Sequence, residues 1–375
     1  MKHRCLVAFG TRPEAIKMAP LIHALRRSPA VDPVVCVTAQ HREMLDSVLD
    51  LFDIKPDRDL SIMRPDQSLN ALLARAIASL DEAMAEIRPD LVLVQGDTAT
   101  ALAGAVAAFM RRVPVGHVEA GLRTGSLDHP WPEEANRRMI SVVTMRHYAP
   151  TQSSVDNLLR EGTDPATVLN TGNTVIDALL SISARLDEDS NWAQEVASRL
   201  PNVTLGKHLI LVTGHRRESF GEGFENICKA LARISERPDV EIVYPVHLNP
   251  NVQTIVHERL ARLGNVHLIP PVDYASIVML MKRAHLILTD SGGIQEEAPA
   301  LGKPVLVMRQ TSERMEAVAA GVAELVSTDP ERIVRATYCL LDDAAHYKAM
   351  ANAVSPFGDG KASERIVADI EQMFA

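Results

Sequence analysis

Short apolar runs without polar alternation recur along the whole chain, and each is followed by residues with apolar positions at helical spacing. In the first half these runs end at Gly10, Ala39, Gly96 and Ala120. Such runs are typical of strands covered on both faces, and strands that alternate with helices form parallel sheets. Similar runs in the second half, HLILVTG, EIVYPVH, HLIP, HLILTD and PVLVM, end at Gly214, His247, Pro270, Asp290 and Met308. The pattern predicts an α/β fold.

The rhythm of strand and helix appears twice, which fits a chain of 375 residues that is too long for one ordinary core. The two halves meet near residue 172, within a segment that ends in the polar stretch 185–191. We expect two doubly wound, Rossmann-like domains, residues 1–171 and residues 172–360. The linker SPFGDGKAS then precedes a last amphipathic helix within residues 361–375.

Composition narrows the class of protein. The net charge of -9 argues against a nucleic-acid binder, although it allows an anionic small ligand. The longest apolar stretch, 101–110, is shorter than the roughly 20 residues that cross a bilayer, and the N-terminal apolar run is too short for a secretion signal. We expect a soluble, cytoplasmic protein. No CxxC pair occurs, which predicts reduced, buried thiols at Cys5, Cys36, Cys228 and Cys339.

Polar residues follow nearly every predicted strand. In open parallel sheets, ligands bind at the carboxyl ends of the strands, so these residues carry most of the functional information. Cations and carboxylates are mixed among them, which favours a ligand cleft over a set of solvated loops. The residues are Thr11 and Arg12, Asp97 and Thr98, Glu119, residues 215–218, His247 and residues 290–293.

Two segments have features of a phosphate site. The segment 289–298 follows a strand and opens a helix with two glycines, so its N–H groups could approach a phosphate. Glu296 and Glu297 are expected in the first helical turn, where one could accept bonds from ribose hydroxyls. An ordinary serine-capped helix is the alternative. Arg12 and Lys17 could meet a diphosphate, or they could be plain surface cations.

Three carboxylates, Asp97, Glu119 and Glu133, fall at predicted cleft positions, and acid–base chemistry needs such groups. A surface ion pair between Glu133 and Arg137, four residues apart on one helix, is the competing interpretation. His215 follows a strand and lies among cations, where it could donate to an anionic oxygen. A purely structural histidine is the alternative there.

Several cofactor motifs are missing from the sequence. The glycine pairs 221/223 and 358/360 lack the third glycine and the strand context of a nicotinamide fingerprint, and neither a Walker A motif nor HExxH occurs. The segments 57–59 and 187–189 match the loose D-x-D pattern of metal-dependent transferases, but they lie in polar connecting sequence and are interpreted as solvated charge. We therefore expect neither a cofactor nor a metal.

Taken together, ten motifs resemble the non-hydrolysing UDP-N-acetylglucosamine 2-epimerases. They occur in order between residues 6 and 360: FGTRPEAIKMAP, QHREML, QGDTATALA, HVEAGLRTG, PWPEEANRR, TGNTVIDAL, TGHRRESFG, YPVHLNPNV, TDSGGIQEEAP and GKPVLVM. The resemblance implies a fold of the glycosyltransferase-B type, with a cleft between two Rossmann-like halves and a C-terminal helix that returns to the N-terminal domain. Ile277 stands where family members often have Phe, which puts uracil stacking there in doubt.

The resemblance also assigns roles to residues. Asp97, Glu119, Glu133 and His215 match the family's essential residues. Many bacterial members are homodimers activated by a second substrate molecule, and Gln40, Arg42, Arg216 and His247 match that regulatory pocket. Contacts to UDP or the sugar are implied at Arg12, Lys17, Asp97, Glu119, His215, Ser291, Gly292, Gly293, Glu297 and Arg314.

The implied reaction is the reversible epimerisation of UDP-N-acetylglucosamine to UDP-N-acetylmannosamine, by elimination of UDP to 2-acetamidoglucal and re-addition. Its product would serve cell-surface polysaccharide synthesis. Spacing does not say which carboxylate removes the C2 proton. The alternatives are a glycosyltransferase of the same fold, a hydrolysing epimerase that releases free N-acetylmannosamine, and a non-catalytic nucleotide-sugar sensor.

Overall fold

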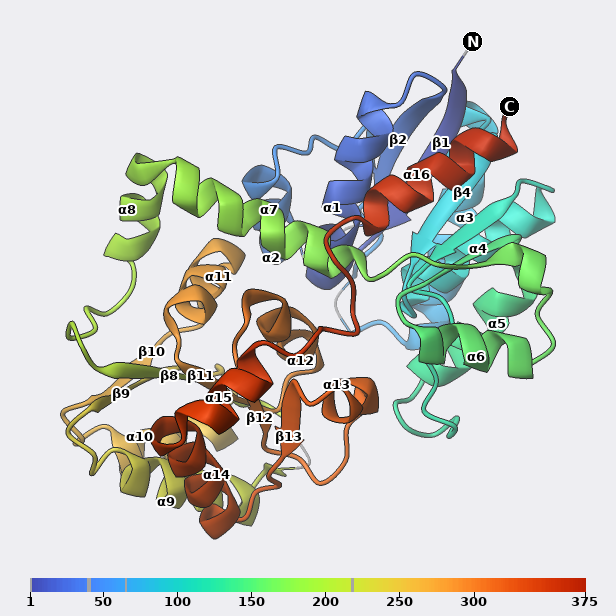
Figure 1. Cartoon of the computed structure of the whole chain (residues 1–375). Coiled ribbons are helices and arrows are strands. Elements are labelled where there is room, and N and C mark those ends of the chain that lie inside the picture. The colour runs from blue at the N-terminus through green and yellow to red at the C-terminus, as the bar shows by residue number, and fades with distance from the viewer. Residues whose placement is uncertain (1, 39–41, 65, 217–218) are drawn as a thin grey trace. The chain divides into compact units, whose positions relative to one another are not determined.

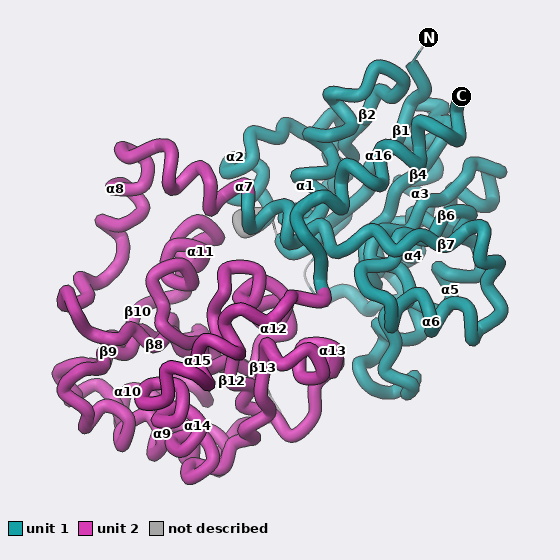
Figure 2. Tube along the Cα trace, viewed as in Figure 1, with its two compact units in different colours: residues 1–180, 357–375 teal, residues 181–356 magenta. Residues whose placement is uncertain are grey.

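The computed structural model describes residues 2–38, 42–64, 66–216 and 219–375 (Figure 1). The chain forms two compact units (Figure 2). Unit 1 comprises Met1–Leu180 and Phe357–Ala375, and unit 2 comprises Ser181–Pro356. The units thus divide at positions other than the domain boundaries expected after residues 171 and 360, and those boundaries stay a prediction. The cleft expected between the two domains also stays a prediction.

Unit 1 is built on a parallel sheet, which has seven strands in the described residues, in the order β3-β2-β1-β4-β5-β6-β7. The strands expected from apolar runs are confirmed as β1, β2, β4 and β5. Sequence analysis missed β3, β6 and β7, because they are short or carry polar side chains. The strands are β1 (His3–Phe9), β2 (Val31–Val37), β3 (Arg58–Asp59), β4 (Leu91–Gln95), β5 (Val115–Val118), β6 (Arg146–Ala149) and β7 (Val168–Asn170).

Helices cover both faces of this sheet, as in a doubly wound fold. On one face α1 contacts α2 and α16, and on the other α3, α4 and α5 pack side by side over the apolar side chains of β1, β4 and β5 (Figure 1). Helix α7 begins in unit 1 and ends in unit 2. The helices are α1 (Arg12–Arg27), α2 (Arg42–Leu51), α3 (Leu69–Ile87), α4 (Ala99–Met110), α5 (Glu133–Val143), α6 (Gln152–Arg160), α7 (Thr174–Glu188) and α16 (Ala362–Met373).

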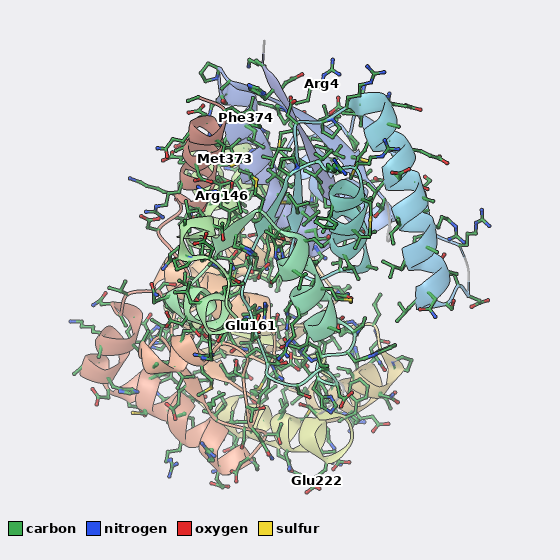
Figure 3. All side chains as sticks on the ribbon, turned by 90° about the vertical axis from the view of Figure 1, so that its right-hand side faces the viewer. Arg4, Arg146, Glu161, Glu222, Met373 and Phe374 are labelled. Atoms are coloured by element: carbon green, nitrogen blue, oxygen red, sulfur yellow. The ribbon has the colours of Figure 1, made fainter. Side chains whose placement is uncertain are left out.

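The C-terminal helix α16 is held to unit 1 by a buried charge. The carboxylate of Asp369 is 5% exposed, accepts two bonds from the Arg146 guanidinium and a third from the Tyr148 hydroxyl at 3.0 Å. At the end of the helix, the ring of Phe374 stacks on His3 with centroids 4.0 Å apart. Figure 3 labels Arg146 and Phe374, which mark the two ends of this contact. Arg146 and Tyr148 face this helix, so β6 lacks an apolar run.

Unit 2 repeats the architecture with a parallel sheet, six-stranded over the residues that the structure describes, in the order β10-β9-β8-β11-β12-β13. Helices α9, α10 and α14 form the apolar core over one face of it, while α8 packs on α11. The two Rossmann-like sheets confirm the expected fold class. The strands are β8 (His208–Thr213), β9 (Val240–Pro245), β10 (Val266–Ile269), β11 (Leu286–Thr289), β12 (Val305–Val307) and β13 (Ala323–Leu325). The helices are α8 (Ser190–Ser198), α9 (Glu222–Ile234), α10 (Pro250–Leu260), α11 (Tyr274–Arg283), α12 (Gly292–Glu297), α13 (Met315–Ala319), α14 (Pro330–Asp342) and α15 (Ala344–Ala351).

The four cysteines are all free thiols, and the expectation that all are buried is wrong for one of them. Cys5, Cys36 and Cys228 are buried, whereas Cys339 is exposed. Cys339 lies on α14, on the side of the helix that faces away from the core, so an apolar sequence context did not guarantee burial. Within the described ranges, no helix is both long and apolar enough to cross a membrane.

Candidate active site

The turn between β1 and α1 is organised by Glu14. Thr11 caps α1 and Pro13 occupies its first turn, so the helix begins at Arg12, three residues before the apolar pattern from Ala15 that first indicated it. The Glu14 carboxylate is 1% exposed and accepts the N–H groups of Gly10 and Thr11 at 3.1 and 2.8 Å. Burial raises the pKa of Glu14 to about 7.

Glu14 also reaches the neighbouring strand end. Thr98 caps α4, directly after Asp97, and its hydroxyl donates to Glu14 at 2.7 Å. Because β1 and β4 are adjacent in the sheet, one carboxylate fixes the turn that carries Arg12 and the turn that carries Asp97. Sequence analysis missed this residue, although Thr11 and Glu14 have the T-x-x-E spacing of a capping box.

Glu119 follows β5 and is held from two sides. The ammonium of Lys17 contacts both carboxylate oxygens at 2.6 and 2.7 Å, and the amide of Gln95 donates to one of them. The backbone of Glu119 has a φ of 64°, in the left-handed region that costs about 1–3 kcal/mol for a residue other than glycine. The turn therefore holds this carboxylate against Lys17. Lys17 was expected to meet a diphosphate, and that contact stays a prediction.

Asp97 pairs with an arginine from α5. The Arg137 guanidinium contacts the Asp97 carboxylate at 2.8 and 2.6 Å, and the Asn136 amide donates to the Asp97 carbonyl at 2.8 Å. Arg137 also contacts the fully buried Glu134 at 3.2 Å. The competing interpretation, a surface ion pair between Glu133 and Arg137, is therefore wrong, because α5 turns Arg137 toward Asp97 and Glu134.

Glu133 opens α5, as expected from the proline-rich segment before it. Its Oε2 atom is buried and has no hydrogen-bond partner among the described residues. Such an orphaned oxygen is costly unless a ligand or a water satisfies it. Of the three predicted carboxylates in unit 1, Glu133 is thus the one with a buried oxygen that no described residue hydrogen-bonds.

In unit 2, His215 follows β8 and lies against Asp290, which follows the adjacent strand β11. His215 Nδ1 is 3.3 Å from Asp290 Oδ1, while Asp290 Oδ2 accepts the N–H groups of His215 and Arg216, both at 2.8 Å. Partial burial lowers the pKa of His215, and the Asp290 carboxylate opposes that effect. Sequence analysis listed Asp290 among the polar residues at the strand ends but gave it no role.

Ser291, Gly292 and Gly293 form the start of α12, as expected, but the two glutamates after them lie elsewhere than predicted. Helix α12 has only six residues, so Glu296 and Glu297 fall at its end and not in the first turn. Glu296 contacts Arg314 Nε at 2.6 Å, and Glu297 accepts the Tyr274 hydroxyl at 2.6 Å. Both carboxylates are thus held by side chains from outside the helix.

Two arginines approach the glycine turn. A Cβ atom on Gly292 would lie 3.7 Å from the Arg314 guanidinium carbon and 3.8 Å from an Arg216 guanidinium nitrogen. The Nε atom of Arg216 is buried without a hydrogen-bond partner among the described residues. A small residue at position 292 therefore leaves room between two cations and the first N–H groups of α12. This arrangement can hold an anion.

The four residues assigned to a regulatory pocket are only partly described. Gln40 lies outside the described residues, and of Arg42 only its place in α2 is described. Arg216 lies beside Gly292, and the His247 ring stacks on His215 with centroids 5.7 Å apart. In the described part of the chain, no group of three or more His, Cys, Asp or Glu side chains could hold a metal ion.

The similarity of this chain to known proteins extends over nearly its whole length. A sequence model of the UDP-N-acetylglucosamine 2-epimerase family matches residues 23–371. The UDP-N-acetylglucosamine 2-epimerase of Escherichia coli K12 is 56% identical, over 97% of each chain. A probable UDP-N-acetylglucosamine 2-epimerase of Ralstonia nicotianae is 56% identical, over 99% of this chain and 100% of the relative.

Solved structures agree with the sequence comparison. The crystal structure of the UDP-GlcNAc 2-epimerase from Neisseria meningitidis bound to UDP-GlcNAc is 48% identical and has a TM-score of 0.92, over 98% of this chain and 100% of the other. Sequence, fold and the order of the site motifs give the same answer. This chain belongs to the UDP-N-acetylglucosamine 2-epimerase family, of the non-hydrolysing bacterial kind, and is an isomerase of the epimerase type.

Proposed function

We propose that this enzyme interconverts UDP-N-acetylglucosamine and UDP-N-acetylmannosamine by eliminating UDP and adding it back. The N. meningitidis relative was crystallised with UDP-GlcNAc, which supports that sugar nucleotide as the substrate. Family membership supports the change at C2. The two-step route is our inference from the chemistry of the substrate and from the side chains of the site.

The substrate restricts the possible routes. The C2 hydrogen lies next to an acetamido group and not next to a ketone, so direct removal of the proton is unfavourable. When the bond from C1 to the diphosphate oxygen breaks, UDP leaves with the electron pair. Positive charge at C1 then acidifies C2–H, and loss of that proton gives the C1=C2 double bond of 2-acetamidoglucal. Return of UDP to C1 and of a proton to the opposite face of C2 completes the inversion.

The carboxylates of unit 1 supply the proton transfers in this proposal. The observation that carries it is that Asp97, Glu119 and Glu133 have three different environments, as acid–base groups with separate tasks would have. Glu119 is fixed by Lys17, and Asp97 by Arg137. The buried, unpartnered Oε2 atom of Glu133 has capacity for a substrate hydrogen bond. Which carboxylate removes the C2 proton stays open.

Unit 2 holds the leaving group in this proposal. The first N–H groups of α12, with Arg216 and Arg314 beside Gly292, bind the diphosphate. His215 supports the developing negative charge on the departing oxygen. Glu297 accepts the ribose hydroxyls, since its Oε2 atom lies at the glycine turn, 3.7 Å from the position of a Cβ on Gly293.

Three further assignments complete the proposal: the location follows from the composition, and the oligomeric state and the activation follow from the family resemblance. The enzyme works in the cytoplasm as a homodimer. A second substrate molecule activates it through Gln40, Arg42, Arg216 and His247. The stack of the His247 ring on His215 supports this assignment, because a ligand that moves His247 would also move the side chain that we propose to assist the departing diphosphate.

Proton NMR in deuterated water with UDP-N-acetylglucosamine alone tests the proposal. The wild-type enzyme is expected to exchange the C2 hydrogen for deuterium and to form UDP-N-acetylmannosamine. Asp97→Asn should abolish the exchange if Asp97 is a base. Asp81→Asn is the matched control, because Asp81 pairs with Arg111 on the surface of α3 and α4. Free N-acetylmannosamine would indicate a hydrolysing epimerase. An unchanged substrate would indicate a transferase or a sensor and would overturn the proposal.

A further inference from the structure

Asp290 is a buried carboxylate at the centre of the loop that carries His215. It is 0% exposed and follows β11, the direct neighbour of β8 in the sheet. Its Oδ2 atom accepts two backbone N–H groups, from His215 and from Arg216, both at 2.8 Å. One carboxylate oxygen thus fixes the backbone of this loop, which leaves the second oxygen for another task.

The second oxygen faces the imidazole. Asp290 Oδ1 is buried, lies 3.3 Å from His215 Nδ1 and has no hydrogen-bond partner among the described residues. A carboxylate has only acceptors, so a hydrogen bond between these two atoms requires a proton on Nδ1. The His215 side chain keeps 41% of its surface exposed, and no described residue hydrogen-bonds its Nε2 atom. One ring nitrogen thus faces the buried carboxylate, and the other has no hydrogen-bond partner among the described residues.

The neighbouring histidine provides a contrast within the same protein. His247 Nδ1 accepts the N–H of Asn249 at 3.1 Å, so this nitrogen must be unprotonated and the proton must be on Nε2. The two stacked rings are therefore expected in opposite tautomers. The difference arises from the partner of Nδ1, a carboxylate for His215 and an N–H donor for His247.

We propose that Asp290 is a positioning residue for His215: it fixes the Nδ1–H tautomer and stabilises the imidazolium, whose Nε2–H then donates to the departing diphosphate oxygen. The inference rests on the role that we propose for His215. A carboxylate that orients a histidine through Nδ1 is a recurrent device in catalysis. No bond is made or broken at Asp290, and no proton has to leave its carboxylate.

The charges around His215 determine whether the loss of the Asp290 carboxylate raises or lowers the pKa of the ring. Partial burial lowers the pKa of His215, as do the Arg216 guanidinium and His247, while the Asp290 carboxylate raises it. Asp290→Asn removes the only one of these four effects that favours the imidazolium. The amide can also turn its NH₂ group toward Nδ1, which would favour the wrong tautomer.

Long-range nitrogen–proton NMR of the 15N-labelled enzyme tests the pair, with His215→Asn used to assign the resonances. The wild type should show His215 protonated on Nδ1 and His247 on Nε2. Asp290→Asn should move the His215 proton to Nε2 and lower the pH at which the ring titrates. It should also lower kcat at least about 10-fold with KM changed less than about 3-fold, because the interaction acts on the departing group.

Asp177→Asn is the matched control. Asp177 is another buried aspartate whose carboxylate accepts two backbone N–H groups, from Ala362 and Ser363, without a histidine beside it. That variant should leave the His215 tautomer and kcat unchanged. If Asp290→Asn does not fold, the wild-type spectrum decides, because an Nε2–H tautomer at His215 overturns the inference. Absent C2 exchange in the wild type would refute the proposed function and leave the tautomer result standing.

Discussion

Glu14 should make the stability of unit 1 depend on pH. Its buried carboxylate receives two backbone N–H groups and the Thr98 hydroxyl, and replacing it by Gln keeps the size of the side chain. The Gln oxygen can accept the two N–H groups while its NH₂ donates to Thr98. The variant therefore resembles the protonated form of Glu14 and has no proton to lose.

The magnitude follows from the pKa. Burial raises the pKa of Glu14 from 4.5 to about 7, so between these values the folded chain holds a proton that the unfolded chain has released. The free energy of unfolding of the wild type then falls by about 1.4 kcal/mol per pH unit, and by about 3 kcal/mol over the window. The contribution is fully present below pH 4.5 and is lost as the pH rises through 7. Glu14→Gln escapes this loss.

Pulsed hydrogen exchange across a urea titration, measured on peptides from β1 and β4, reports the unfolding of unit 1. The difference in unfolding free energy between Glu14→Gln and the wild type should grow by about 3 kcal/mol from pH 4.5 to pH 7. Glu82→Gln, which removes an exposed carboxylate from α3, is the control for the lost charge. Parallel curves for the Glu14 variant and the wild type would refute the reasoning, because Glu14 would then titrate alike in both states.

Three other changes probe the packing. Asp369→Asn leaves the guanidinium of Arg146 without its buried partner and should lower the free energy of unfolding by about 3–5 kcal/mol. Hydrogen exchange of α16 peptides in the same urea titration measures this change, and an unchanged midpoint would contradict the prediction. Gly121→Ala places a Cβ 2.3 Å from the Ser154 carbonyl oxygen at a φ of 88°, which should cost at least about 2 kcal/mol and lower Tm in calorimetry. N-ethylmaleimide should label Cys339 first in the native protein, because the other three thiols are buried. Peptide mass spectrometry measures the labelling, and equal labelling of all four thiols would contradict that burial.

The strand ends were predictable, and with them the positions of the candidate catalytic groups. Buried parallel strands need uninterrupted apolar residues, so the first polar residue after each run marks the ligand edge of the sheet. Asp97, Glu119 and His215 were found in this way. Short or half-polar strands such as β6 escaped the same reasoning, because their side chains bind polar partners from distant segments.

The partners of those groups were not predictable from spacing. Glu133 and Arg137 have the separation of a helical ion pair, yet Arg137 contacts Asp97 from 40 positions earlier in the chain. Lys17 follows Glu14 by three positions on one helix, which is also the separation of a helical ion pair, yet it contacts Glu119, 102 positions away. Spacing along one helix shows only which charged residues of that helix are close to each other. Which of these pairs form depends on the charged side chains that neighbouring strands and helices bring close.

Periodicity and composition by themselves determined two α/β units, each with a parallel sheet. A strand buried on both faces needs an uninterrupted run of apolar residues, and such runs are visible in the sequence. The order of the site motifs likewise determined the family. Only the tertiary structure decided that Glu14 joins two turns, that Asp290 supports His215 and that α12 ends at its glutamates. The physical reason is that a carboxylate's hydrogen bonds are satisfied through space by whichever donors the packed elements bring near, and no local pattern encodes that distance.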